Sequence, residues 1–441
     1  MALADFFVSL LTFVAIYSLF GIGLNVKYGF TGLIDFGHVA YFMIGAYVTV
    51  VLTMPAGGGT TYEGLGGFAL PALLAFPGGG LLGWALALVV GMAAAAVVSL
   101  LVGIPTLRLR EDYLAITALG IATILNSVFD NERWLFNGAF GIREIYQPLA
   151  DVAPLSTGNF QLNLVVFGLP SLAVLAYLAY RTFGVVRPLG RNPALWMTAA
   201  VLARKALVDA ERVEPALALA AAELFALWYV VSPVVTDGVV DLVLNLLWLF
   251  DPNAGPAGGL DYDRLFLLLC IALLAGAYWW VQRTVNSPYG RVLRAVREDE
   301  TVAETLGKRT FRYKLQSLGF GSALAGAAGG LWAANLGFID PTQFASTVTF
   351  FAYTAVIIGG TANNRGVILG TVVFWVINSG TRFLDDFFPA EYAIQLAATR
   401  LMLIGALLIV ILYYRPEGIL GEQSYGFGID GGSKRRGGVD E

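Results

Sequence analysis

The chain has little charge, one cysteine and one histidine, and each scarcity excludes a class of protein. Only 13% of its 441 residues are charged, while 57% are hydrophobic. Soluble domains carry about 25% charged residues, so most of this surface must face lipid. Cys270 alone excludes a disulfide framework and a cysteine metal cluster, and His38 alone leaves no material for a zinc site or for Ser/His/Asp catalysis. We therefore expect no metal site, no bound cofactor and no catalytic residues.

The chain also has no basic excess and no phosphate-binding loop. Its net charge is -4 and its pI is about 5.2, which argues against a nucleic-acid partner. The G-x-x-x-x-G-K-[ST] pattern is absent, since Gly431-Gly432-Ser433-Lys434 lacks the required spacing. The sequence therefore predicts no nucleotide site in this chain, and any ATP chemistry must come from another subunit.

Long apolar stretches, by contrast, run through the whole sequence. A helix needs about 20 mostly apolar residues to cross the hydrocarbon, and glycine-broken stretches can also do so. Eleven stretches qualify: 6–25, 34–54, 81–104, 113–130, 162–181, 216–235, 264–282, 315–335, 347–362, 366–383 and 397–414. We predict an all-α, polytopic membrane bundle of about 10–11 helices with broken or re-entrant segments. This transmembrane domain would occupy 1–430, its first span retained rather than cleaved as a signal peptide, with a flexible tail at 421–441.

Charged loops predict which side of the membrane each end faces. The densest basic stretch, which marks a cytoplasmic loop, comprises Arg283, Arg291, Arg294, Arg297, Lys308, Arg309, Arg312 and Lys314. Acidic loops at 237–263 and 385–391 then lie outside, and the C-terminus lies in the cytoplasm. Residues 29–37 form either an ordinary loop or a break within a helix. Residues 184–215 form either an interfacial amphipathic helix or a solvated connector.

The basic loop itself contains a predicted helix. Ser287 and Pro288 form a helix start, and Gly307 a helix end. Apolar side chains follow one edge between them, at Val292, Leu293, Val296, Val302 and Leu306. The charges are of mixed sign, which disfavours binding to anionic lipid and favours docking into a partner protein.

This loop resembles the cytoplasmic coupling loop of ATP-binding-cassette (ABC) branched-chain amino-acid permeases, the LivM/LivH family. The run is Ser287-Pro288-Tyr289-Gly290-Arg291-Val292-Leu293-Arg294, continuing to Lys314. In that family the loop carries a degenerate E-A-A-x-x-x-G element that enters a cleft on the ATPase subunit. The resemblance implies that coupling to the ATPase involves Arg291, Arg294, Arg297, Glu300, Ala303, Glu304 and Gly307.

Three further stretches are similar to the family, in the same order along the chain. They are the run from Gly29 to Tyr47, the run from Leu107 to Ile116 with Gly138, Gly141 and Ile142 after it, and a glycine series at Gly359, Gly360, Gly366 and Gly370. The resemblance covers about 10–145 and 260–420. The sequence departs from the family pattern at Glu111, Ala362, Arg365 and Val367, and 184–262 is longer than is usual.

The resemblance implies a permease subunit that imports branched-chain or other hydrophobic amino acids across the cytoplasmic membrane. It implies four kinds of partner: ABC ATPase subunits, a second permease of the LivH type, an extracytoplasmic solute-binding protein and membrane lipid. A permease for urea or short amides is an alternative. An ion-coupled secondary transporter is another, and it requires inverted repeats and charges buried within the membrane. Only Asp35 and Glu223 meet the second requirement in the sequence.

Polar residues in apolar surroundings are candidates for the translocation path. They are Asp35, His38, Asn126, Ser127 and Asp340, with Gln343 beside the last. For each, hydrogen-bonded packing or helix capping is the competing interpretation. Glycines with a structural role are expected at Gly32, Gly37, Gly45, Gly326, Gly330, Gly359, Gly360 and Gly366. Gly321, Ala325 and Gly329 form one column on a helix and Ser322, Gly326 and Gly330 the next, a flat ridge for close packing.

Overall fold

The computed structural model describes residues 3–55, 67–74, 80–150, 261–380, 393–415 and 417–422. The predicted spans 162–181 and 216–235, the segment 184–215, Glu223 and residues 423–441 of the tail lie outside the described residues. Within the described part, the regular secondary structure is helical apart from one short antiparallel ribbon. In that ribbon β1 (Ile142–Arg143) pairs with β2 (Phe338–Ile339).

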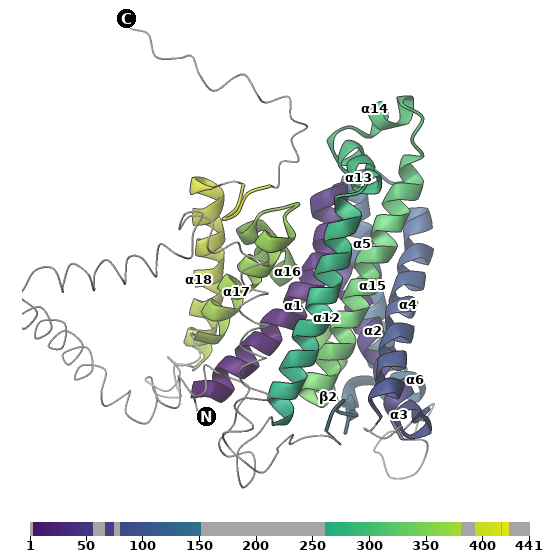
Figure 1. Cartoon of the computed structure of the whole chain (residues 1–441), viewed down its shortest axis with the longest axis vertical. Coiled ribbons are helices and arrows are strands. Elements are labelled where there is room, and N and C mark those ends of the chain that lie inside the picture. Colours follow the sequence, from purple (N-terminus) through teal and green to yellow (C-terminus); the bar gives the residue numbers. More distant parts are fainter. Residues whose placement is uncertain are drawn as a thin grey trace, which may run out of the picture.

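Nine of the predicted spans fall within the described residues, apart from 381–383 of one span, and each contains a helix (Figure 1). They are α1 (Leu3–Thr31), α2 (His38–Thr53), α4 (Leu81–Thr106), α5 (Glu111–Asn131), α12 (Tyr262–Val285), α15 (Thr310–Leu336), α16 (Thr347–Gly359), α17 (Asn364–Gly380) and α18 (Ala393–Tyr414). Four of the described helices, α1, α4, α5 and α12, are long and apolar enough to cross a membrane by themselves. The prediction of an all-α, polytopic membrane protein is confirmed.

Helix α15 lies at the centre of the bundle and packs against α1, α2 and α4. Its two columns of small residues make this possible, because a Cβ on Gly321, Gly326 or Gly329 would collide with atoms of these neighbours. Gly321 lies against Gly23 of α1, and Gly329 against Phe42 of α2. The ridge therefore serves three neighbouring helices at once, more than the single close approach that the sequence suggested.

The chain between α1 and α2 is a break that turns back into the bundle. Helix α1 ends at Thr31, and the next residue, Gly32, has a φ of +77°, a conformation that favours glycine. Residues 33–36 then run without helical structure to His38, whose ring nitrogen Nε2 lies 3.1 Å from the Phe20 carbonyl oxygen. Phe20 is 11 residues before the end of α1, which places it about 16 Å further into the bundle along the helix axis at 1.5 Å per residue. The segment 29–37 is therefore a broken, re-entrant region rather than an ordinary loop.

The segment between α15 and α16 is built in the same way at the other end of the bundle. Helix α15 ends at Gly337, with φ of +67°, and β2 and the 3-10 helix η3 (Pro341–Phe344) follow. Helix α16 then begins beside the start of α2, where the Val39 amide donates to the Thr349 hydroxyl over 3.0 Å. We call 32–37 the inner break and 337–346 the outer break.

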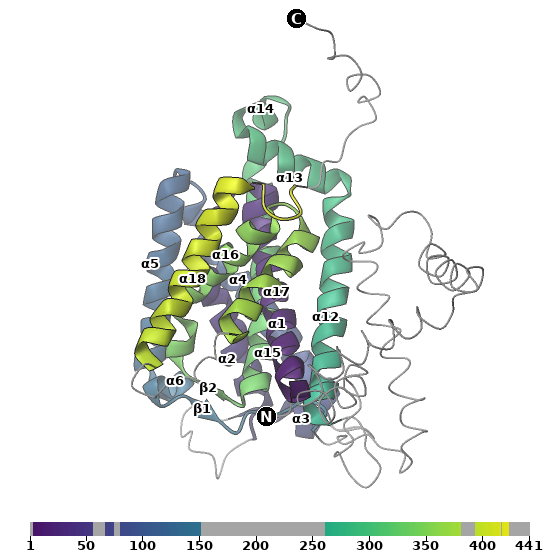
Figure 2. The ribbon, with the colours of Figure 1, turned by 90° about the vertical axis from the view of Figure 1, so that its left-hand side faces the viewer.

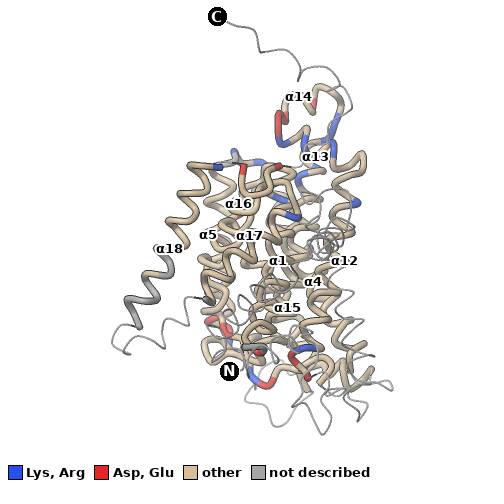
Figure 3. The backbone as a smooth tube through the Cα atoms, turned by 60° about the vertical axis from the view of Figure 1, so that its left-hand side comes forward, with Lys and Arg blue, Asp and Glu red and all other residues tan. Residues whose placement is uncertain are grey.

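Helices α13 (Pro288–Glu298) and α14 (Glu300–Thr305) project from one end of the bundle, with the C-terminal end of α18 on the same side (Figures 1 and 2). The N-terminus lies at the opposite end. Lys and Arg gather around α13 and α14, whereas the middle of the bundle carries few charges (Figure 3). The prediction of one helix from Ser287 to Gly307 is wrong at Asp299, which is extended and caps α14 by accepting from the Val302 amide.

The remaining short elements lie at the end opposite α13. They are α3 (Leu70–Leu73), α6 (Arg133–Phe136) and the 3-10 helix η1 (Gly138–Phe140). The family-like glycines Gly138 and Gly141 have positive φ here, at +57° and +66°. They form the turn after which β1 pairs with β2, so this part of the chain packs against the outer break and supports it.

Candidate functional site

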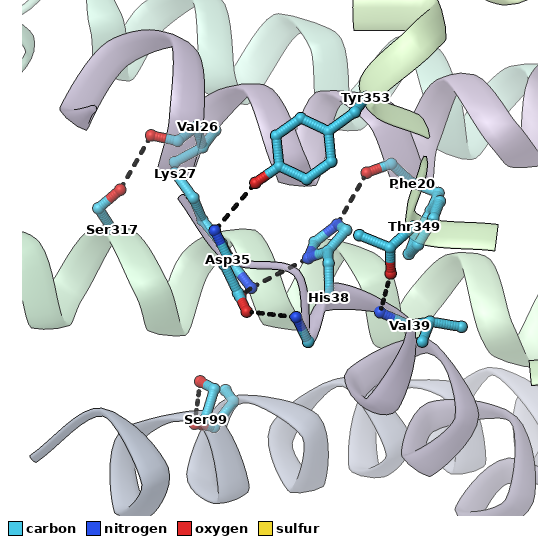
Figure 4. A network of polar contacts seen from close by, with 12 residues as sticks. Phe20, Val26, Lys27, Asp35, His38, Val39, Ser99, Ser317, Thr349 and Tyr353 are labelled. Carbon is cyan, nitrogen blue, oxygen red and sulfur yellow. Dashed lines mark hydrogen bonds and ion pairs between the residues drawn. The ribbon is translucent and has the colours of Figure 1, made fainter. Parts of the chain in front are cut away.

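The inner break holds a cluster of three ionisable side chains inside the bundle (Figure 4). The Lys27 ammonium of α1 donates to Asp35 Oδ2 over 2.8 Å and lies 3.0 Å from His38 Nδ1. All three residues are buried, and Lys27 has no exposed surface. A charge this deep is costly unless it is paired, so the Lys27–Asp35 ion pair is the central contact of the break.

Neighbouring helices complete the cluster. Asp35 Oδ1 accepts from the Gly37 amide over 3.0 Å, and the Asp35 amide donates to the Tyr353 hydroxyl of α16 over 2.9 Å. The Lys27 ammonium also lies 4.3 Å from the centre of the Tyr41 ring, a cation–π contact. The break thus joins α1, α2 and α16 through groups whose hydrogen bonds are made within the protein.

Lys27 is the functional candidate that the sequence analysis missed. The first predicted span, 6–25, ends before Lys27 and so leaves it outside the membrane. The sequence signal was the position of Lys27. The helix continues past it from Tyr28 to Thr31, and Asp35 and His38 follow 8 and 11 residues after Lys27. A lysine shortly before a glycine-flanked aspartate in an apolar segment indicates an ion pair.

The path candidates Asp35 and His38 are therefore brought together, whereas Asn126, Ser127 and Asp340 lie elsewhere. The Asn126 side-chain amide donates to the Pro341 carbonyl of the outer break over 2.7 Å. Asp340 caps η3 by accepting from the Thr342 amide over 2.8 Å. Ser127 is exposed on α5. The four other candidates, Asp35, His38, Asn126 and Asp340, have packing or capping contacts in the structure, and their role in the path is a matter for proposal.

Arg297 connects the projecting helices to the inner break. Its Nη1 donates to the Gly29 carbonyl of α1 over 2.7 Å, and its Nη2 lies 2.7 Å from Glu422 and 2.6 Å from Glu298. Burial opposes the charge of Arg297, but the hydrogen bonds that it donates to these two carboxylates raise its pKa above the ordinary value. It is therefore a permanent cation held between α13, the end of α1 and the segment after α18.

The other predicted coupling residues divide into inward and outward groups. Arg294 donates to the Val285 carbonyl over 3.0 Å, Ala303 is buried, and Glu300 forms an ion pair with Lys314 of α15. Arg291, Glu304 and Gly307 are exposed, although Glu304 also accepts from the Thr310 hydroxyl. The inward group fixes α13 and α14 to the bundle, and the outward group lies on the exposed surface of this projecting segment.

The predicted structural glycines lie at close backbone contacts or at turns. A Cβ on Gly37, Gly45, Gly326, Gly330, Gly359 or Gly366 would overlap with atoms of a neighbouring segment. Gly32 and Gly360 instead have positive φ, +77° and +115°. Gly32 lies directly under Arg297, where a Cβ would be 3.1 Å from its Cγ. This glycine therefore lets α13 approach the inner break closely.

Comparisons with known proteins agree with this arrangement. The family described as "Branched-chain amino acid transport system / permease component" matches residues 6–412. The chain is similar to the high-affinity branched-chain amino acid transport system permease protein LivM of Escherichia coli K12, with 26% identity over 416 residues, 94% of this chain and 69% of that protein.

Two further relatives match shorter stretches. A probable branched-chain amino acid transport permease protein LivM of Methanocaldococcus jannaschii is 32% identical over 164 residues, 36% of this chain and 46% of that protein. The high-affinity branched-chain amino acid transport system permease protein LivH of Escherichia coli K12 is 30% identical over 135 residues, 31% of this chain and 40% of that protein. No solved structure matches the chain.

Proposed function

Because the chain belongs to the family of branched-chain amino acid transport system permease components, we propose that it is a membrane-spanning subunit of an ABC importer for branched-chain amino acids. The similarity to LivM along nearly the whole chain carries this proposal. The importer resides in the cytoplasmic membrane, with α13, α14 and the C-terminus in the cytoplasm. A solute-binding protein delivers the substrate from outside, and this chain itself makes and breaks no covalent bond.

Uptake by the complete transporter tests the substrate. Reconstituted with its ATPase subunits, second permease and binding protein, it should accumulate radiolabelled leucine only when ATP is supplied. Accumulation of urea rather than leucine would favour the amide-permease alternative. Labelling of Arg294→Cys by an impermeant reagent from outside intact cells, in a Cys270→Ala background, would contradict the assigned orientation.

The free surface of α14 supports docking to the ATPase subunit. Leu306 is 72% exposed and Val302 53% exposed, and both lie outside the bundle, one helical turn apart. Exposed charges surround this apolar pair at Glu298, Asp299, Glu304, Lys308 and Arg309. An apolar centre with a charged rim is the usual anatomy of a protein interface, and a cleft on the ATPase would cover it.

We expect Leu306→Asp to remove the ATPase subunit from the complex. The change places a charge at the centre of a desolvated contact, where a lost anchor costs about 2 kcal/mol or more, a weakening of at least roughly thirtyfold. Co-purification of the ATPase with the permease from detergent-solubilised membranes measures it. Leu306→Met is the matched control and should retain the ATPase. Equal recovery of the ATPase with Leu306→Asp would exclude this docking surface.

Arg297 would transmit the motion of the docked helices to the inner break. Its guanidinium is the contact of α13 with the Gly29 carbonyl, and Gly29 lies only two residues from Lys27. Arg297→Ala should therefore keep the ATPase bound but reduce leucine uptake per ATP hydrolysed, by roughly tenfold to a hundredfold if one charge-assisted hydrogen bond of about 1.5–3 kcal/mol is lost. Measured together, co-purification and the uptake-to-ATP ratio separate this effect from that of Leu306→Asp. An unchanged ratio would remove Arg297 from the coupling route.

The translocation path would run along α5, where a second permease of the LivH type covers it. One face of α5 exposes Gly120, Thr123, Ser127 and Asn131 at helical spacing. The side chains of Thr123 and Asn131 donate hydrogen bonds to backbone carbonyls of the same helix, and a Cβ on Gly120 would meet nothing within 4 Å. Small polar residues are typical of helix contacts and aqueous paths rather than of lipid-facing surfaces.

One observation favours the second candidate, an ion-coupled transporter. The buried cluster of Lys27, Asp35 and His38 supplies titratable groups within the membrane, which that mechanism requires. Its test is uptake into proteoliposomes containing this chain without any ATPase, driven by a proton or sodium gradient. Gradient-driven leucine uptake there would replace the ABC proposal.

A further inference from the structure

The two breaks share a sequence motif and a backbone geometry. The inner break contains Gly32-Leu33-Ile34-Asp35 and the outer break Gly337-Phe338-Ile339-Asp340. In each, the glycine has positive φ and ends a long helix, and the aspartate accepts through Oδ1 from the amide two residues later. Two segments 305 positions apart in the sequence thus reverse the direction of the chain after a long helix with the same backbone geometry.

The side chains around each aspartate also correspond. Five residues before the glycine stands a donor on the long helix, Lys27 or Trp332, and three residues after the aspartate stands His38 or Gln343. Lys27 binds Asp35 and His38. At the outer break Gln343 donates to Asp340 Oδ2 over 3.1 Å, and Trp332 Nε1 donates to Gln343 Oε1 over 3.4 Å. The outer break thus repeats the arrangement of the inner one without its lysine and histidine.

The helices that follow the breaks repeat this correspondence with inverted direction. Helix α1 is followed by α2, α4 and α5, and α15 by α16, α17 and α18. Helix α15 packs on α2 and α4, and α1 packs in the same manner on α16 and α17. Since α1 and α15 run in opposite directions (Figure 1), the two sets form an inverted repeat, with one break near each side of the bundle.

One further contact of the inner break has no counterpart at the outer break. At the inner break, Tyr353 of α16 accepts a hydrogen bond from the Asp35 amide. Near the outer break α2 carries Tyr47, 15 residues after Gly32, whereas Tyr353 is 16 residues after Gly337, and the centre of the Tyr47 ring lies 5.8 Å from that of Phe344. Tyr47 is fully buried, and its hydroxyl has no hydrogen-bond partner among the described residues. A buried hydroxyl without a partner is unfavourable, so Tyr47 has an unused hydrogen-bonding group beside the outer break.

We propose that Tyr47 is a positioning residue of the transport cycle, which closes the outer break by accepting a hydrogen bond from the Asp340 amide when the inner break opens. Tyr353 holds the inner break in the state seen here, and the two tyrosines engage in alternation. The inverted repeat supplies two equivalent arrangements of one bundle, as alternating access requires. This inference rests on the proposed function.

Matched cysteine reporters test the proposal in the complete transporter. In a Cys270→Ala background, Ile34→Cys reports on the inner break and Phe338→Cys on the outer break, both with a water-soluble maleimide in lipid nanodiscs, because both side chains are partly exposed. Labelling rates are compared without nucleotide, with ATP and with ATP plus vanadate. The state in which Ile34→Cys reacts fastest should protect Phe338→Cys. In that state Tyr47→Phe should raise Phe338→Cys labelling about threefold to tenfold, as the loss of one hydrogen bond allows.

Two comparisons make the result decisive. In the state in which Ile34→Cys reacts slowest, which corresponds to the arrangement described here, Tyr47→Phe should change neither reporter, because its hydroxyl makes no bond there, whereas Tyr353→Phe should accelerate Ile34→Cys. If the reporters respond to nucleotide but Tyr47→Phe leaves Phe338→Cys unchanged in every state, the Tyr47 proposal is wrong and the importer assignment stands. If neither reporter responds to nucleotide while the ATPase subunit is bound and active, both proposals fall.

Discussion

Lys27→Met is expected to reduce the amount of folded protein more than any other single change considered. The substitution keeps the volume of the side chain but leaves the Asp35 carboxylate buried without its ammonium partner. Breaking a buried ion pair by removal of one member costs about 3–5 kcal/mol, a large part of the 5–15 kcal/mol that stabilises a typical protein. The fraction of protein that stays monodisperse in detergent after a heating series measures the loss.

The partner substitution provides the control. Asp35→Asn combined with Lys27→Met removes both charges, and replacement of a buried ion pair by neutral groups is often nearly neutral. The double variant should therefore recover most of the stability lost in Lys27→Met. Equal stability of the single and double variants would show that the 2.8 Å contact between Nζ and Oδ2 contributes little.

The double variant also separates the two roles considered for Asp35. If it folds and imports leucine normally, the cluster serves packing, and Asp35 and His38 leave the list of path residues. If it folds but transport is lost, the charges act in the cycle itself. Stability and uptake therefore have to be measured on the same preparation.

Helix positions were predictable from the sequence because lipid imposes a minimum apolar length, and this constraint acts on each segment independently. The predicted span 81–104 corresponds to α4, and 315–335 to α15. The break after Gly32 was also accessible, since glycines around Asp35 interrupt an apolar run. Length and glycine content are local properties, and a single sequence contains them.

Lys27 and the Asp299 interruption were not predictable in the same way. Lys27 is stable inside the bundle only because the re-entrant chain returns Asp35 to it, which is a tertiary event. Asp299 sits among charges that fit an exposed helix, and its preference for capping over a helix interior decides the local geometry. The inverted repeat was concealed because Lys27 and Trp332 occupy equivalent places with unlike side chains.

Gly45→Ala is expected to separate the central helices. Gly45 of α2 lies against the backbone of Gly326 in α15, and a Cβ there would overlap with the Gly326 carbonyl carbon and oxygen. Backbone atoms cannot rotate away as a flexible side chain can, so α2 must move as a unit. Overpacking of this kind costs about 1–3 kcal/mol and occasionally more, and the displaced α2 would carry the end of the inner break, at Gly37, with it.

Gly276→Ala is the matched control for this change, because it adds the same methyl group to α12 where nothing lies within 4 Å. There the better helix propensity of alanine should stabilise the protein by up to about 1 kcal/mol. Thermal stability in detergent should thus fall for Gly45→Ala and stay level or rise for Gly276→Ala. A Gly45→Ala protein as stable as the parent would mean that α2 and α15 do not approach at this point. Loss of stability together with faster labelling of Ile34→Cys would instead link the close packing of α2 to the closed state of the inner break.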